Sequence, residues 1–170
     1  TSSVTSMEFT FYKAEAFNQA LVWDTSKVTT TLATFNGAIA FNSELAWDTS
    51  SVTNMDGTFS YAEAFNQPLD WDTSSVTTMP GTFVGADAFN QPLVWDTSEV
   101  TMMEATFTSA KAFNQPGISA WDISKVSAMT QMFDDSALAS DECSKVQVRD
   151  AWQSVAAFTY DWSAAVCPGL

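Results

Sequence analysis

The chain has 170 residues, 46 % of them hydrophobic and 14 % aromatic, a composition that supports one domain with a sizeable core and is unlike that of a disordered chain. Twenty Asp and Glu against six Lys and Arg give a formal net charge of -14, which repels nucleic-acid phosphates and anionic membrane surfaces. We therefore expect no nucleic-acid partner, and no membrane insertion because no apolar run approaches the roughly 18 residues of a membrane span.

The first residues belong to a repeated pattern. The opening "TSSVTSMEFTF" matches "TSSVTTMPGTF", which begins at Thr73, so the first unit begins in its middle. We expect the chain to be part of a longer protein whose targeting signal would lie upstream. An uncapped N-terminal unit would expose apolar surface, and it predicts self-association through that end.

A period of 24 residues runs through most of the chain. Five Phe residues follow it, and four Trp residues do the same before a fifth comes after 26 residues: Phe17, Phe41, Phe65, Phe89 and Phe113; Trp23, Trp47, Trp71, Trp95 and Trp121. Self-similarity at a fixed period is typical of stacked repeats. We predict an array of tandem units over residues 1–139.

Each unit predicts a strand followed by a helix. The segment Leu69–Val76 fits the pattern LxLxxNxL of a leucine-rich-repeat strand, with Trp71 in the second Leu position. Val76, Met79, Phe83 and Ala86 then follow at helical spacing. The predicted fold class is an α/β repeat solenoid, a leucine-rich-repeat-like stack of short parallel strands and short helices with a helical C-terminal cap.

The period stops after Phe133, and residues 140–170 are predicted to form the cap. An amphipathic pattern predicts a helix of about 15 residues that begins near Ser140 or Asp141. The only two cysteines of the chain, Cys143 and Cys167, lie in this segment. A disulfide is favoured over two free thiols, since no metal-binding spacing or His accompanies them, and it would indicate an oxidising compartment.

The Trp, Asn and Thr columns of the repeat are interpreted as structural. Trp and Leu lie two residues apart, so in an extended segment their side chains point to the same side. Core packing of the Trp column is therefore favoured over a sugar-stacking platform. The Asn after each Phe is expected to hydrogen-bond turn backbone. The Thr column is interpreted as helix capping, with an ice-binding hydroxyl ladder as the alternative; it consists of Thr5, Thr29, Thr53, Thr77 and Thr101.

The Asp column is the candidate binding feature. These residues should point outward, one per coil: Asp24, Asp48, Asp72, Asp96 and Asp122. Stacked carboxylates repel, and either an Asx turn to the residue two positions on or a bound cation would offset this repulsion. The Asx turn is favoured, calcium is the one cofactor kept as an alternative, and the two can coexist. The candidate face adds the neighbouring outward column of Val22, Ala46, Asp70 and Val94.

The pattern "FNQPLxWDTSxVTxMxxTF" resembles the bacterial surface protein 26-residue repeat of the BspA-like leucine-rich-repeat group. The resemblance covers residues 1 to about 136 of this sequence. It implies an extracellular or cell-surface protein of bacteria or unicellular eukaryotes, tied to adhesion or protein binding, without enzymatic activity. A disulfide-tied cap like residues 140–170 also closes many such arrays.

No catalytic constellation is visible in the sequence. The chain has no His, no Gly-rich phosphate loop and no His/Cys metal cluster, and Glu15, Glu44 and Glu63 change identity between units as a solvated surface does. We therefore expect a non-enzymatic extracellular recognition or adhesion module that binds a protein or surface partner through the sheet face. One alternative is a structural subunit that assembles end to end into a filament or larger surface complex. Another is ice or crystal-surface binding.

Overall fold

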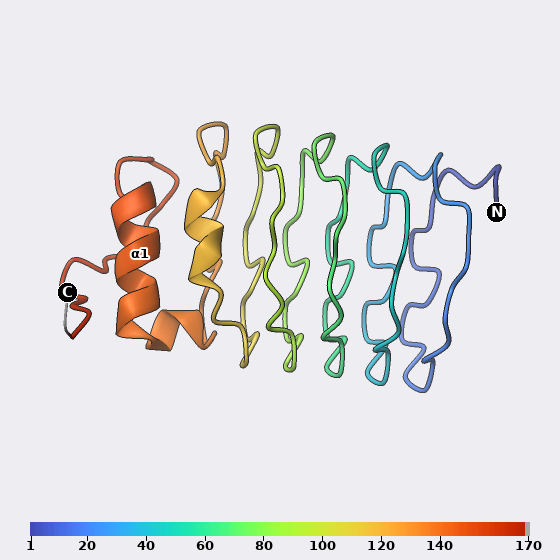
Figure 1. Ribbon diagram of the computed structural model, residues 1–170, viewed down its shortest axis with the longest axis horizontal. Helices are drawn as coiled ribbons and strands as arrows, with labels where there is room; N and C mark the ends of the chain where they lie inside the picture. The colour runs from blue at the N-terminus through green and yellow to red at the C-terminus, as the bar shows by residue number, and fades with distance from the viewer. Residues whose placement is uncertain (169–170) are drawn as a thin grey trace.

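The repeats form a row of stacked coils. The computed structural model describes residues 1–168, and the coils follow one another from the N-terminus at one end to helix α1 (Glu142–Trp152) at the other (Figure 1). We number the coils 1 to 5 from their first residues, 16, 40, 64, 88 and 112, with an incomplete coil of residues 1–15 before them. The last two residues of the predicted cap, 169 and 170, lie outside the described part.

One row of parallel contacts sets the register between coils. The bridges join Ser6 to Thr30, Thr30 to Asn54, Asn54 to Thr78, Thr78 to Met102, and Met102 to Ala128. Partners differ by 24 residues until the last pair, where the difference is 26 because coil 5 carries two more residues. The added residues lie by the 3-10 helix η1 (Pro116–Ala120), and the bridges continue past it in the same row.

The predicted leucine-rich-repeat fold is wrong. Within residues 1–168 each bridge is isolated and none extends into a strand. The helices are η1, the 3-10 helix η2 (Leu138–Ser140) and α1, so no helix lies in residues 1–115. The predicted strand Leu69–Val76 makes no backbone-to-backbone hydrogen bond with another coil. The repeats therefore build neither a parallel sheet nor a helical layer.

Left-handed residues prevent the predicted helix. Two positions of each unit, four residues apart, have positive φ, for example Gly81 at 59° and Gly85 at 62°. An α-helix requires right-handed φ and ψ at every residue and bonds from each N–H to the fourth preceding C=O. Here Thr82 and Val84 donate instead to the third preceding carbonyl. The segment is a run of overlapping turns.

Alternate backbone N–H groups in this segment join the coils. The N–H groups of Met79, Gly81 and Phe83 donate to Met102, Glu104 and Thr106 of the next coil, at 3.1, 2.8 and 2.9 Å. Between them Pro80 has no N–H, and the N–H groups of Thr82 and Val84 bond within their own coil. The same forward bonds recur in every unit that is followed by another coil, so the turn-rich edge is where most backbone bonds between neighbouring coils are made.

Aromatic side chains fill the core. The Phe83 ring centroid lies 4.2 Å from that of Phe89, and 5.5 Å from those of Phe59 and Phe107, one repeat before and after. All four Phe residues are fully buried, and the Trp rings stack beside them, with Trp47 and Trp71 6.0 Å apart. Burial of a large apolar side chain contributes about 1.5–3 kcal/mol, so the repeated rings are the main cohesive element of the stack.

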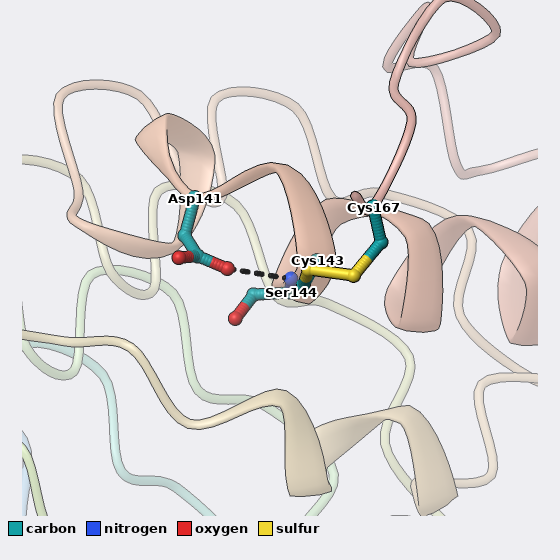
Figure 2. Close-up of a disulfide and its surroundings, with 4 residues drawn as sticks. All are labelled: Asp141, Cys143, Ser144 and Cys167. Carbon is teal, nitrogen blue, oxygen red and sulfur yellow. Dashed lines mark hydrogen bonds between the residues drawn. A yellow bond between two sulfur atoms is a disulfide. The ribbon is translucent and has the colours of Figure 1, made fainter. Parts of the chain in front are cut away.

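A C-terminal cap closes the last coil. Helix α1 begins after Asp141, whose carboxylate accepts the Ser144 N–H at 2.7 Å, and Cys143 and Cys167 form the predicted disulfide (Figure 2). The helix has 11 residues and ends at Trp152, so it is shorter than predicted. Trp152, which is 1 % exposed, stacks against Phe133 of the final coil.

Tyr160 supplies the acceptor that a further coil would supply. Its hydroxyl accepts the Phe133 N–H at 2.7 Å and donates to the Asp134 carboxylate at 2.7 Å. Burial raises the pKa of Tyr160 above its ordinary range, so the hydroxyl stays protonated and able to donate. The cap therefore replaces the coil-to-coil hydrogen bond of this Phe position, whose equivalents Phe83 and Phe107 bond to backbone carbonyls.

We predict that Gly85→Ala destabilises the stack. Gly85 has a φ of 62°, and a Cβ there would lie 2.7 Å from the Tyr61 ring of the preceding coil. A left-handed non-glycine residue costs roughly 1–2 kcal/mol, and displacement of the ring adds to this cost. Chemical denaturation measures the change. Gly117→Ala is the matched control, because nothing lies within 4 Å of its Cβ position; equal losses in the two variants would contradict the prediction.

We predict that Tyr160→Phe lowers the free energy of unfolding by about 1–3 kcal/mol, because it leaves a buried N–H group without an acceptor. Tyr61→Phe is the control, since the Tyr61 hydroxyl makes no hydrogen bond within the described residues. Thermal and urea unfolding measure both variants. An unchanged Tyr160→Phe protein would show that the cap does not depend on this acceptor.

Candidate binding face

The Asp column forms a row of Asx turns, as predicted. The carboxylate oxygen of Asp72 accepts the Ser74 N–H at 3.0 Å and the Ser74 hydroxyl at 2.6 Å. The same backbone contact occurs at the other four Asp residues, at 2.9–3.2 Å. All five side chains are exposed. Each carboxylate thus has a donor in its own coil that offsets repulsion from its neighbours.

These contacts lower the pKa of four of the Asp residues. The neighbouring serine hydroxyl is the main cause at Asp24, Asp72, Asp96 and Asp122, followed by the backbone N–H of the same serine. At Asp96 the charges of Asp72 and Asp122 act in the opposite direction, but they are minor. These four carboxylates therefore stay ionised to lower pH than an ordinary Asp.

The Asp residues do not gather into a metal site. In the described part of the chain, no group of three Asp, Glu, His or Cys residues is arranged to hold a metal ion. Calcium prefers six to eight oxygen ligands, and one carboxylate per coil falls far short of that number. The Asx turn explains the Asp column without a cation.

The outward column beside the Asp row is fully exposed. Val22 and Val94 are 97 % and 96 % exposed, and Ala46 and Asp70 also face solvent. The alternation predicted from the sequence is therefore confirmed: Leu45, Trp47 and their equivalents in the later coils are buried beneath, and Leu21 and Trp23 of the first coil are partly buried. Within residues 1–168 the Asp70 carboxylate accepts no hydrogen bond, so it is available for contact with a partner.

The face is not a sheet, and this corrects the sequence interpretation. Between Asn66 and Asp72 no backbone group bonds to the backbone of another coil. Indole groups join the coils here instead: Trp71 Nε1 donates to Leu45 O, and Trp95 Nε1 to Leu69 O, each at 3.2 Å. The threonine after each Asp adds a second link, as when Thr49 Oγ1 donates to Asp72 O at 2.9 Å.

Two grooves lie between the extended segments of neighbouring coils. The first, between coils 2 and 3, has a volume of about 390 Å³; it is lined by Glu44, Leu45, Ala46, Trp47, Pro68, Asp70 and Trp71. The second, between coils 4 and 5, has a volume of about 320 Å³ and a lining without charged residues. Glu44, interpreted from sequence as solvated surface, thus lies with Asp70 on one groove. Glu44 and Pro68 occupy the same position of the repeat, two residues before the outward column. This spacing is the sequence signal that could have placed Glu44 beside the outward residues.

The remaining columns hold the coils together. Asn42 Oδ1 accepts the Asn66 N–H, and Asn66 Oδ1 accepts the Asn90 N–H, both at 2.9 Å, so the predicted bond to turn backbone is confirmed. The exposed Thr column does not cap helices, because no helix begins there. Its hydroxyls donate to the preceding coil, as in Thr53 to Thr29 O at 3.2 Å.

A second, buried Thr column was not predicted. The Thr82 hydroxyl lies 2.7 Å from Met79 O of its own coil and 3.1 Å from Met55 O of the preceding coil. Thr34, Thr58, Thr82 and Thr106 are all fully buried. The recurring Thr-Phe dipeptide was the sequence signal, since a polar residue repeated beside a core Phe needs an internal partner.

A family model described as "Mycoplasma protein of unknown function, DUF285" matches residues 1–70 and again residues 69–164. The chain belongs to the DUF285 family. The double match agrees with the tandem coils, and it places the chain in a BspA-like repeat family in the general sense. No curated protein and no solved structure matches the chain. Among residues 1–168 of this DUF285 protein, no helix is long and apolar enough to cross a membrane.

We predict that Ser74→Ala raises the pKa of Asp72 toward its ordinary value of 3.8, because the hydroxyl is the main cause of the lowering. A lowered folded-state pKa stabilises the fold above the unfolded value, and this contribution is lost as pH falls through the folded pKa. The variant should therefore melt below the native protein at neutral pH, and the difference should shrink under acid. NMR titration and melting curves measure both effects.

Ser75→Ala is the control for this pair, because the Ser75 hydroxyl donates to Ser50 O of the preceding coil and leaves Asp72 untouched. An Asp72 pKa that is the same in Ser74→Ala and in the native protein would contradict the assignment of its cause.

Proposed function

We propose that this DUF285 protein is a non-enzymatic recognition module that binds a protein partner through the outward face of its coils. We define this face as the Asp row, Asp24, Asp48, Asp72, Asp96 and Asp122, together with the column Val22, Ala46, Asp70 and Val94. The observation that carries the proposal is the near-complete exposure of Val22 and Val94 on a regularly spaced stack of coils.

Variation between the units supports this role. The Phe, Asn, Trp and Asp positions keep their residue in every full unit, and each makes a contact within or between coils. The outward column changes from Val to Ala to Asp to Val. Repeat arrays present extended binding surfaces because the invariant residues fix the stack and leave the remaining positions free to differ.

We further propose an extracellular or cell-surface location. The Cys143–Cys167 disulfide supports an oxidising compartment, and the resemblance to BspA-like surface proteins supports adhesion as the wider role. The excess of carboxylates on the face favours a partner that is basic where it makes contact.

The cap argues against the filament alternative. End-to-end growth would need the C-terminal end of one copy to accept another coil, but α1 and Tyr160 already cover Phe133 there. Nor is ice binding proposed, because the exposed Thr hydroxyls donate to carbonyls of the preceding coil and no further observation points to an ordered surface.

The test is a double variant, Val22→Lys with Val94→Lys, compared with Glu63→Lys on another side of the coils. Exposed substitutions change stability by about 0.5 kcal/mol or less, so all three proteins should fold alike. We expect a protein from the cell-surface fraction of the source organism to bind the native chain and the control. The double variant should bind that purified protein at least about tenfold more weakly in surface plasmon resonance. Equal affinities, or no binding protein at all, would overturn the proposal.

A further inference from the structure

The groove between coils 2 and 3 combines an apolar interior with an acidic rim. Leu45, Trp47 and Trp71 form its base, Ala46 and Pro68 its sides, and the carboxylates of Glu44 and Asp70 its edge. The three base residues are almost fully buried, whereas the other four are exposed. A ligand in this groove would meet hydrocarbon and indole below and negative charge at the edge.

The groove is open because the coils are not bonded backbone to backbone at this point. Pro68 has no N–H to donate, and the link across the groove is the indole bond from Trp71 to Leu45 O. This leaves the backbone N–H groups of Ala46 and Asp70 without an acceptor in the neighbouring coil. The groove is thus a consequence of the repeat.

No basic residue in the described part of the chain neutralises the rim. Among residues 1–168 Glu44 and Asp70 make no ion pair within 4 Å, and no Lys or Arg lines the groove. Four of the six basic residues pair elsewhere, with Asp87, Glu99, Glu142 and Asp150. Of the other two, Lys13 lies over the Tyr12 ring. The charge of Lys27 is a minor contribution to the lowered pKa of Asp24. The Asp48 and Asp72 carboxylates add negative charge two residues further along the same face.

We propose that this groove binds an arginine side chain of the protein partner. The inference rests on the proposed function and names the chemistry of the contact. The methylene groups of arginine suit the apolar base, and its guanidinium, which carries five N–H donors, suits a rim of carboxylates. A guanidinium is also weakly hydrated and packs well against indole, whereas an ammonium is a compact and strongly hydrated charge.

The second groove provides an internal comparison. It occupies the same place in the repeat, between Pro92 and Trp121, and has a similar base of Leu93 and Trp95. Its outward residues are Val94 and Ala120 where the first groove has Ala46 and Asp70, and no carboxylate lines it. It should therefore not select a cation, and Ala120→Asp, which places a carboxylate at the position of Asp70, should give it part of that selectivity.

The experiment is an NMR titration of the full chain with the peptide acetyl-Gly-Arg-Gly-amide. We expect saturable shifts of the Trp47 and Trp71 indole signals and none at Trp95. Asp70→Asn and Glu44→Gln should each weaken binding about two- to fivefold, as for exposed ion pairs, and added salt should weaken it further. Glu63→Gln, with the same change of charge elsewhere, should leave the affinity unchanged.

Two further peptides separate the chemistries. Replacement of Arg by Lys should weaken binding, and replacement by Gln should abolish it. Equal shifts with the Gln peptide would mean that the groove takes any small polar group, and this would overturn the proposal. So would an affinity that neither Asp70→Asn nor Glu44→Gln alters.

The two proposals can fail separately. If a partner binds through Val22 and Val94 but the Arg peptide does not titrate the groove, the recognition function stands and the arginine site falls. If the peptide binds as expected but the double Lys variant leaves partner binding unchanged, the arginine site stands, but the partner does not bind through Val22 and Val94 and the proposed function falls.

Discussion

The structure depends on how each coil divides its backbone N–H groups between itself and the next coil. In the turn-rich edge, alternate N–H groups bond forward to the neighbouring coil and the intervening ones bond within the coil. This division needs a left-handed residue at two positions per unit, and eight of the twelve residues that occupy them are not Gly. A buried N–H without a partner is costly, so the bonded edge outweighs the local strain of these residues.

The rest of the coil packs around that edge. Once the backbones are bonded on one side, the centroids of equivalent Phe and Trp rings lie 5.3–6.1 Å apart from coil to coil. Buried Thr hydroxyls donate to carbonyls at the bends, and the Asn side chains accept from N–H groups there. On the opposite side the links are indole N–H and Thr hydroxyl groups. That side therefore keeps grooves that a sheet would have closed, and the candidate recognition surface lies there.

The cap shows the same rule at the end of the array. The last coil has no following carbonyl for the Phe133 N–H, and Tyr160 provides a hydroxyl in its place. Trp152 continues the stack of rings, while the Cys143–Cys167 disulfide ties the end of the described chain to the start of α1. Function and closure are thus separated: the cap protects the open end of the core, and the outward face remains free along the array.

The sequence by itself determined the period, the buried Phe and Trp columns, the outward parity of Val22, Ala46, Asp70 and Val94, the Asx turns and the disulfide, because each depends on local spacing or simple pairing. Only the tertiary structure decided where the coils bond to one another. Alternation along Leu69–Val76 reports which side chains are buried, but not whether a neighbouring backbone lies within bonding distance. Spacings of three and seven residues fit overlapping turns as well as a helix, although the Pro80-Gly81 pair, typical of a type II turn, favoured turns. Glu44 and Asp70 line the same groove because the backbones of their two coils are not bonded there. This arrangement follows from the packing of two coils, so it cannot be derived from one repeat alone.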